Sequence, residues 1–135
     1  MYVDNASANF VLHPERFDVI VTTNMIGDIL SDLGAAIMGS LGLGPSGNIN
    51  PEKEYPSMFE PIHGSAPDIA GKGIANPISA IWSGALMLDH LGQQEASEAI
   101  LNAITAVLET GLAPADLGGQ AKTDEIGDAI VKHLK

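Results

Sequence analysis

Apolar residues recur at helical spacing through most of the second half of this chain. From position 77 to 91 they fill almost every place, with Ser79 and Ser83 among the few polar exceptions. A helix that is apolar almost all round is buried, either in a core or against another subunit. Asn76 is a good capping residue and Pro77 suits a first helical turn, so we expect the helix to begin there.

Two further helices are predicted after it. The first ends at Gly111, and its apolar residues fall on one face at helical spacing. These residues are Ala96, Ala99, Ile100, Ala103, Ile104, Val107 and Leu108. The second is capped by Thr123 and has acidic residues early and lysines late, which matches the helix dipole.

The first half of the chain is predicted to hold shorter elements. We expect a helix over residues 4–12, capped by its first residue, and a helix over residues 27–38. Between them, residues 18–23 are apolar and β-branched with turn-like flanks, which predicts a buried strand. A glycine-rich run over residues 39–47 should break regular structure, and residues 57–59 are predicted to form another short strand.

Composition and charge narrow the possible partners. The chain has 135 residues, 45% of them hydrophobic, which is enough for one domain with a core, and it has no cysteine. Seventeen acidic residues against six basic ones give a net charge of −11, so nucleic acid and anionic membranes are not expected partners. No apolar run reaches membrane-spanning length and no signal peptide is evident, so we expect a cytoplasmic protein.

Two carboxylates are placed to share a ligand. Asp28 and Asp32 lie four positions apart on a predicted helix, so their side chains share one face. A solvated acidic face is the common explanation of such a pair in an acidic protein. A divalent cation is the alternative, because magnesium and manganese accept hard oxygen ligands and would reverse the repulsion between the two charges.

A long loop of polar and small residues runs from Phe59 to Pro77 directly into the predicted buried helix. Glycines allow a ligand to approach the backbone closely, and amides near a helix start favour negative charge, so a phosphate-bearing ligand would suit this loop. Taken alone, His63 is more often a surface or capping residue, and the glycines of the loop would simply be turns.

Both regions resemble motifs of the isocitrate/isopropylmalate dehydrogenase family, whose β-decarboxylating members oxidise 2-hydroxy acids. Asn24–Leu33 resembles the metal-binding signature of that family, and Phe59–Pro77 resembles its cofactor loop. The resemblance extends over the whole chain but matches only the C-terminal portion of the family enzymes, which are well over twice as long. It implies an α/β fold of this family that is incomplete, with residues 1–135 as a single C-terminal segment.

The resemblance implies that Asp28 and Asp32 hold Mg²⁺ or Mn²⁺. It also implies that Asp4, which follows an aromatic residue as in the family pattern, reaches the metal of a neighbouring subunit. A homodimer with shared metal sites is therefore expected. Ile26 departs from the family, which has an aromatic or polar residue there, and this weakens the inference about packing behind the ligands.

For the cofactor, the resemblance implies contacts of the adenosine and phosphate portions with one group of residues. These are His63, Gly64, Ser65, Ala66 and Asn76. Asp68 and Ile69 stand where family members that prefer NADP carry lysine and tyrosine, and a carboxylate at the ribose repels a 2′-phosphate, so NAD is expected. Glu60 is a candidate contact of the nicotinamide half and Asp116 of the adenine end, although both residues are open to a purely structural role.

The flanking segments resemble tartrate and D-malate dehydrogenases more than 3-isopropylmalate dehydrogenases. These segments are residues 10–18, 48–52 and 81–90. The implied substrate is a small 2-hydroxy dicarboxylic acid. No catalytic residue is expected within the chain, because the family's substrate-binding arginines and its proton-transferring tyrosine and lysine have no match here. Two hypotheses follow: part of a longer oxidative decarboxylase that is inactive alone, or a noncatalytic NAD- or metal-binding or dimerising remnant.

Overall fold

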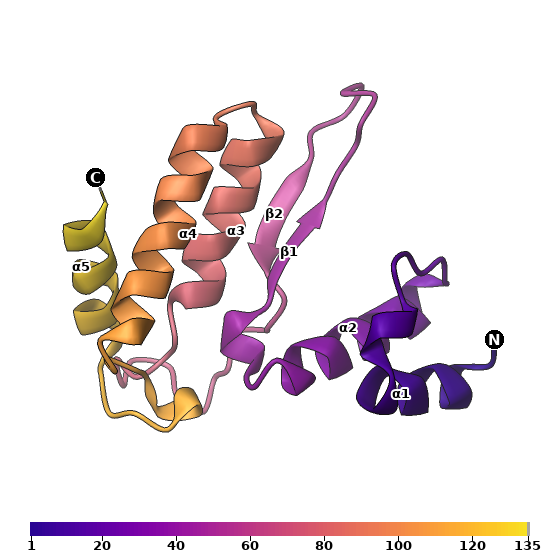
Figure 1. Ribbon diagram of the computed structural model, residues 1–135, viewed down its shortest axis with the longest axis horizontal. Helices are drawn as coiled ribbons and strands as arrows, with labels where there is room; N and C mark the ends of the chain where they lie inside the picture. Colours follow the sequence, from indigo (N-terminus) through magenta and orange to yellow (C-terminus); the bar gives the residue numbers. More distant parts are fainter. Residues whose placement is uncertain (135) are drawn as a thin grey trace.

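The computed structural model describes residues 1–134 as two helix-rich regions joined through a β-hairpin (Figure 1). The helices are α1 (Val3–Leu12), α2 (Asn24–Ile37), α3 (Ile78–His90), α4 (Gln94–Glu109) and α5 (Thr123–His133). The strands are β1 (Pro45–Asn48) and β2 (Met58–Pro61), and short 3-10 turns lie at η1 (Pro14–Arg16), η2 (Leu41–Leu43) and η3 (Ala115–Leu117). The hairpin, α3, α4 and α5 pack in that order, while α1 and α2 extend away from them.

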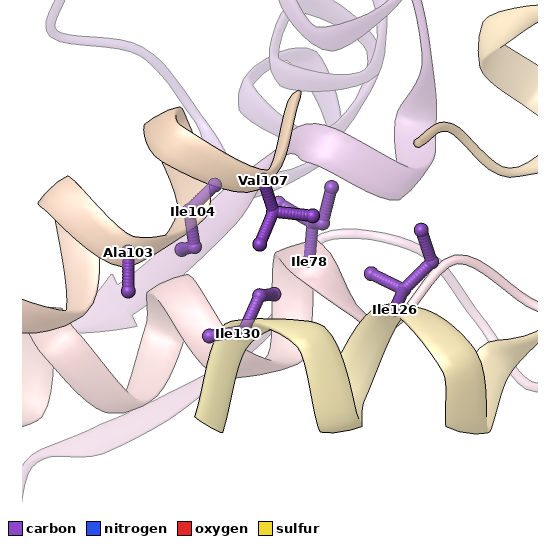
Figure 2. Close-up of a cluster of buried hydrophobic side chains, with 6 residues drawn as sticks. All are labelled: Ile78, Ala103, Ile104, Val107, Ile126 and Ile130. Atoms are coloured by element: carbon purple, nitrogen blue, oxygen red, sulfur yellow. The ribbon is translucent and has the colours of Figure 1, made fainter. Parts of the chain in front are cut away.

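The core of the protein lies between α3, α4 and α5. Six apolar side chains from these helices are buried and point toward one another (Figure 2). They are Ile78, Ala103, Ile104, Val107, Ile126 and Ile130. Four of them, Ile104, Val107, Ile126 and Ile130, follow helical spacing within their own helix, so each of α4 and α5 packs through one apolar face, and that of α4 includes residues predicted for it.

The apolar helix predicted from residue 77 is present as α3, but it is not buried all round. Met87 is 41% exposed, whereas the two serines that interrupt the apolar pattern, Ser79 and Ser83, are 0% and 3% exposed. Both hydroxyls donate hydrogen bonds to the hairpin backbone: Ser79 to the Gly44 carbonyl, and Ser83 to the Glu60 carbonyl at 2.8 Å. The two serines therefore lie where α3 meets the hairpin and the residue before it, and their hydroxyls satisfy carbonyls there.

The hairpin pairs β1 with β2 in antiparallel register, with Pro45 opposite Pro61 and Asn48 opposite Met58. The strand predicted at residues 57–59 is confirmed with a shift of one or two residues. The break predicted over residues 39–47 ends earlier than expected, because β1 begins at Pro45. At the base of the hairpin the Ile62 amide donates to the Gly44 carbonyl at 3.0 Å.

The strand predicted over residues 18–23 is wrong within the described residues. No regular structure is assigned there, and Val19 and Val21 are 85% and 95% exposed. A β-branched run forms a strand only when another strand accepts its hydrogen bonds, and the sheet described in residues 1–134 contains β1 and β2 alone.

Three expectations about helix ends and faces also need correction. Asp4 is not a cap: α1 begins at Val3 with Tyr2 before it, and Asp4 lies in the first turn. Thr123 is the first residue of α5 and not its cap. On α4 the expected apolar face is shifted at its start, where Ala96 is exposed and its neighbour Ser97 is buried. In residues 1–134 no helix has the length and apolarity needed to cross a membrane.

Candidate functional site

The loop that follows β2 lines a cavity of about 1020 Å³. Its lining from this loop consists of residues 62–66, 69–71 and 73–76. The rest of the wall comes from Asp32 of α2, from residues 40–42, from residues 115–116 and from Thr123. Small-molecule sites in proteins commonly measure roughly 300–1,000 Å³, so the cavity has room for a large ligand.

The backbone of the loop turns sharply at several points. Gly71 and Gly73 have φ of 75° and 65°, and Ala66 has φ of 41°, which is uncommon for a residue with a side chain. Two turn hydrogen bonds, from Ile69 to Ala66 and from Lys72 to Ile69, are both 3.1 Å long. The loop is therefore a chain of tight turns that presents backbone along one wall of the cavity.

Asn76 and Asp116 both line the cavity and are hydrogen-bonded to each other. The Asn76 side chain is 9% exposed, its Oδ1 accepts from the Ile78 amide at 2.9 Å, and its Nδ2 donates to the Asp116 carboxylate at 3.0 Å. Ser40 also donates its hydroxyl to that carboxylate and accepts from the Gly42 amide at 2.9 Å. One carboxylate thus joins the start of α3 to the turn at residues 40–42. The helix predicted to begin at Pro77 with Asn76 as its cap begins one residue later, at Ile78 with Pro77 as the capping residue, and the Asn76 side chain accepts from the Ile78 amide.

Thr123 holds the other end of the loop. Its hydroxyl donates to the Ala75 carbonyl at 2.6 Å, and its amide donates to the Gly73 carbonyl at 3.0 Å. The first turn of α5 is capped instead by Glu125, whose carboxylate accepts from the Lys122 amide at 2.8 Å. Thr123 therefore docks α5 onto the cavity wall.

Most of the residues predicted to bind the cofactor come together in this cavity. His63, Gly64, Ser65, Ala66, Ile69 and Asn76 all line it. Glu60 and Asp68 do not: Glu60 is exposed on β2, and Asp68 is exposed in the turn between two lining residues. The Nδ1 of His63 lies 3.0 Å from the Gly64 carbonyl, which orients the imidazole ring along the loop.

The three predicted metal ligands do not form one cluster within residues 1–134. Asp28 and Asp32 are exposed one turn apart on α2, and Asp4 is exposed on α1, where it accepts from the Asn5 amide at 2.8 Å. No group of three or more histidine, cysteine or acidic residues in residues 1–134 is close enough to hold a metal ion. Carboxylate oxygens are suitable donors for Mg²⁺ or Mn²⁺, and Asp32 also lines the cavity. The pair therefore fits as two ligands of a site that needs further ligands from elsewhere.

Ser40 and Thr123 belong to this site although the sequence did not indicate them as site residues. Ser40 and its partner Asp116 are 76 positions apart, and Thr123 and Ala75 are 48 apart. Neither serine nor threonine stands in a local pattern that would distinguish it from a loop or capping residue. Asp116 was identified only as a candidate, and the structure assigns it an internal hydrogen-bonding role.

Comparisons with known proteins identify the class to which this arrangement belongs. Residues 1–130 match the family described as isocitrate/isopropylmalate dehydrogenase. The chain belongs to this family. A tartrate dehydrogenase/decarboxylase of Pseudomonas putida is 56% identical over 139 aligned positions, covering 98% of this chain and 38% of the relative. An isocitrate/homoisocitrate dehydrogenase of Thermus thermophilus is 57% identical, covering 98% of this chain and 39% of the relative.

Solved structures agree with that assignment. An isocitrate dehydrogenase from Methylococcus capsulatus superposes with a TM-score of 0.91 at 46% identity, covering 98% of this chain and 39% of the other. A β-decarboxylating dehydrogenase from Thermococcus kodakarensis superposes with a TM-score of 0.82 at 43% identity, covering 98% of this chain and 38% of the other. The predicted family and its α/β fold are therefore confirmed. The chain spans less than two fifths of the length of these relatives and matches their C-terminal portion.

Proposed function

We propose that this chain is the nucleotide-binding and metal-ligating portion of an NAD-dependent, decarboxylating 2-hydroxy acid dehydrogenase. The observation that carries the proposal is the cavity of about 1020 Å³, because most of the cofactor loop and the predicted metal ligand Asp32 line it together. We expect the complete enzyme to be a cytoplasmic homodimer with metal sites shared between subunits.

The loop suits a dinucleotide for physical reasons. At Ala66, Gly71 and Gly73 the loop turns sharply and carries small or no side chains, so phosphate groups can approach its backbone closely there. Asn76 cannot leave its place easily, since both ends of its amide are hydrogen-bonded. When bound, NAD would accept the hydride released by the oxidation of a hydroxyl group. The residues of this chain would hold and orient it.

Asp68 is the proposed determinant of NAD preference. It is exposed in the turn between two residues that line the cavity, so its carboxylate is free to reach a ligand at the rim. A carboxylate there accepts hydrogen bonds from both ribose hydroxyls and repels a 2′-phosphate. Glu60 remains the proposed contact of the nicotinamide half. Because Glu60 does not line the cavity, that half of NAD would lie outside it.

Asp28 and Asp32 would hold Mg²⁺ or Mn²⁺ by their carboxylates, with Asp4 serving the metal of the partner subunit. The carboxylates of Asp28 and Asp32 have no hydrogen-bond or ion-pair partner within the described residues, so they are available to a cation. Held by these carboxylates, a divalent cation would supply Lewis-acid stabilisation of negative charge on the substrate.

Tartrate or D-malate is the proposed substrate. The similarity of the flanking segments supports it, as do relatives named D-malate dehydrogenase [decarboxylating] in Escherichia coli, at 54% identity, and tartrate dehydrogenase/decarboxylase in Pseudomonas putida, at 56%. The isocitrate/homoisocitrate dehydrogenase of Thermus thermophilus is as similar at 57%, so assays need isocitrate and homoisocitrate beside 3-isopropylmalate.

Titration calorimetry of the chain with NAD and with NADP tests the proposal. We expect saturable binding of NAD and binding of NADP that is at least about tenfold weaker. Asp68→Lys should narrow or reverse that preference. Asp128→Lys makes the same change of charge on the exposed face of α5, away from the cavity, and should leave it unchanged.

Several outcomes would contradict the proposal. Absence of saturable NAD binding would remove the nucleotide-binding role. Equal effects of Asp68→Lys and Asp128→Lys would mean that overall charge, and not a local contact, sets the preference. Binding of NAD by a chain that also fails to give activity when joined to the rest of a family enzyme would favour the noncatalytic alternative.

A further inference from the structure

The last residues of the cofactor loop are held by a segment that is distant in the sequence. Thr123 donates its hydroxyl to the Ala75 carbonyl at 2.6 Å and its amide to the Gly73 carbonyl at 3.0 Å. Asp116, in the same segment, accepts from the Asn76 side chain at 3.0 Å. The two stretches run side by side beneath the helices in Figure 1. The end of the loop is therefore bonded to this segment at three residues.

The segment that makes these bonds, residues 113–123 between α4 and α5, is itself fixed, and we call it the clasp. Its backbone closes on itself, because the Ala121 amide donates to the Ala113 carbonyl at 3.1 Å and the Gly119 amide to the Pro114 carbonyl at 2.9 Å. A Cβ on Gly119 would overlap the Ala113 carbonyl, so a larger residue does not fit this turn. Pro114 is buried, and Ala121 packs against the core cluster. The clasp thus connects the core to the end of the loop.

The rest of the loop has no comparable support. Among the residues that the structure describes, residues 63–72 hydrogen-bond only with one another, through turns such as that from the Lys72 amide to the Ile69 carbonyl. A Cβ on Gly64 or Gly71 would meet nothing within 4 Å, so open space surrounds the backbone there. The position of the loop end therefore depends on the clasp, and not on the loop.

Asn76, which the clasp holds in place, carries unpaired backbone groups. It is only 9% exposed and lines the cavity, yet its backbone amide and carbonyl make no hydrogen bond within residues 1–134. Buried backbone groups are nearly always paired with protein, water or ligand. The Asn76 side chain does not satisfy them, because its oxygen accepts from the Ile78 amide and its nitrogen donates to Asp116. The backbone of Asn76 is therefore available to a ligand in the cavity.

We propose that Thr123 is a positioning residue of the nucleotide site. Through its bonds to Gly73 and Ala75 it fixes the backbone that leads into Asn76, while Asp116 fixes the Asn76 side chain. The buried backbone of Asn76 thereby keeps its place at the cavity wall. Thr123 acts through the loop and does not touch the reacting atoms. The inference rests on the proposed function, because it names a residue on which nucleotide binding depends.

Titration of the 135-residue chain with NAD tests the inference. Thr123→Val keeps the branched shape of the side chain and removes its hydroxyl, and we expect at least about tenfold weaker NAD binding. Thr123→Ser restores the hydroxyl and should bind NAD within about threefold of the unchanged chain. Thr105→Val is the matched control, because the Thr105 hydroxyl bonds to the Leu101 carbonyl within α4, away from the cavity, and its loss should not change the affinity.

Hydrogen–deuterium exchange separates positioning from a general loss of stability. In Thr123→Val, the amides of residue 123 and of Ile78 bond to the loop end and should exchange at least about tenfold faster relative to their intrinsic rates. The amides of Ile104 and Ile130 in the core should keep their protection. Saturating NAD should restore protection at Ile78, since bound nucleotide holds the loop end. Thr123→Ala removes the same hydroxyl with a smaller side chain and repeats the comparison if Thr123→Val does not fold.

The results that would overturn the inference differ in what they leave of the proposed function. Equal NAD affinity of the unchanged chain and Thr123→Val would overturn the inference and leave the proposed function standing. Equally weak binding by Thr123→Val and Thr123→Ser would do the same, because the hydroxyl would not be the cause. Weaker binding with an equal loss of protection at Ile104 and Ile130 would assign Thr123 a purely structural role. Absence of NAD binding by the unchanged chain would remove the proposed function itself, and this role with it.

Discussion

The Asn76 amide nitrogen donates to the Asp116 carboxylate at 3.0 Å, across 40 positions of sequence. Because the same Asn76 side chain also accepts from the Ile78 amide, one residue connects the start of α3 to the far wall of the cavity. The cavity and the core are therefore coupled, since Ile78 is the first residue of α3 and is completely buried.

Replacing Asn76 should show this coupling. Asn76→Ala leaves the buried Ile78 amide and one hydrogen-bond position of Asp116 unsatisfied, so we expect a loss of about 1–3 kcal/mol in the free energy of unfolding. Urea denaturation followed by circular dichroism measures it. Asn102→Ala is the control, because Asn102 is exposed on α4 and alanine favours a helix there. Similar losses in both variants would contradict the assigned role.

Gly42 should not accept a side chain. A Cβ at this position would lie 2.6 Å from the Asp116 carboxylate oxygen and 2.8 Å from the Asn76 Cβ, which are both held by hydrogen bonds. We expect Gly42→Ala to cost about 1–3 kcal/mol of stability and to weaken NAD binding, since the wall must shift. Gly84→Ala on α3, where nothing lies within 4 Å, should instead stabilise by about 0.5–1 kcal/mol. Thermal denaturation separates the two signs.

Ser83 should stabilise the hairpin more than its small size suggests. Its hydroxyl oxygen lies 2.8 Å from both the Glu60 and the Ser79 carbonyl oxygens, which share its single proton, and accepts from the Ser46 amide at 3.4 Å. Ser83→Ala should therefore lower the unfolding free energy by about 1–2 kcal/mol. It should also increase the exchange rate of the β1 and β2 amides. Thr105→Ala removes an exposed hydroxyl bonded within α4 and should be nearly neutral; an equal loss there would contradict the prediction.

Manganese binding tests the acidic pair on α2. Asp28→Asn removes one charge of the pair, so we expect at least about a tenfold weaker affinity for Mn²⁺, measured by electron paramagnetic resonance of the free ion. Asp128→Asn makes the same chemical change at an exposed site on α5 and should leave the affinity unchanged. Unchanged binding in Asp28→Asn would return Asp28 and Asp32 to the simpler role of a solvated acidic face.

The isolated chain should not turn over substrate. A positioned acid or base typically raises the reaction rate by roughly 10²–10⁴-fold. This chain has no residues that match the proton-transferring tyrosine and lysine of the family. We expect no NAD reduction above background with D-malate, tartrate, isocitrate or 3-isopropylmalate in the presence of Mn²⁺. Clear turnover by the purified chain would contradict this prediction. The intact mass of the endogenous protein, against 14.0 kDa for this chain, then shows whether a longer enzyme exists.

Elements that contain their own stabilising contacts were predictable from sequence. α4 ends at Glu109, close to the predicted stop at Gly111, and α3 begins at Ile78, one residue after the predicted start, because helix-end signals and periodic faces act over a few residues. Residues 18–23 were predicted wrongly because a strand depends on a partner that lies elsewhere. Ser83 was taken as an exception to a buried face, and its burial follows only from the position of the hairpin carbonyls.

The candidate site, like the fold, was predictable only in its local parts. The cofactor loop was predictable, since its glycines and polar residues form one continuous run and most of them line the cavity. The hydrogen bonds of Ser40, Asp116 and Thr123 that join segments of the cavity lining were not predictable, because each bond joins residues at least 40 positions apart. Local patterns contain no information about such distant pairs.

The hairpin offers a practical advantage. Its base is fastened by Ile62 to Gly44 and by the α3 serines, and its far end by the Asn50 amide, which donates to Ser57 at 3.0 Å. Residues 51–56 between those contacts are all exposed and belong to neither strand. Extra residues at an exposed turn are tolerated when the flanking backbone is held. A fluorophore or epitope inserted there would report on the chain inside a larger assembly while the cavity keeps its shape.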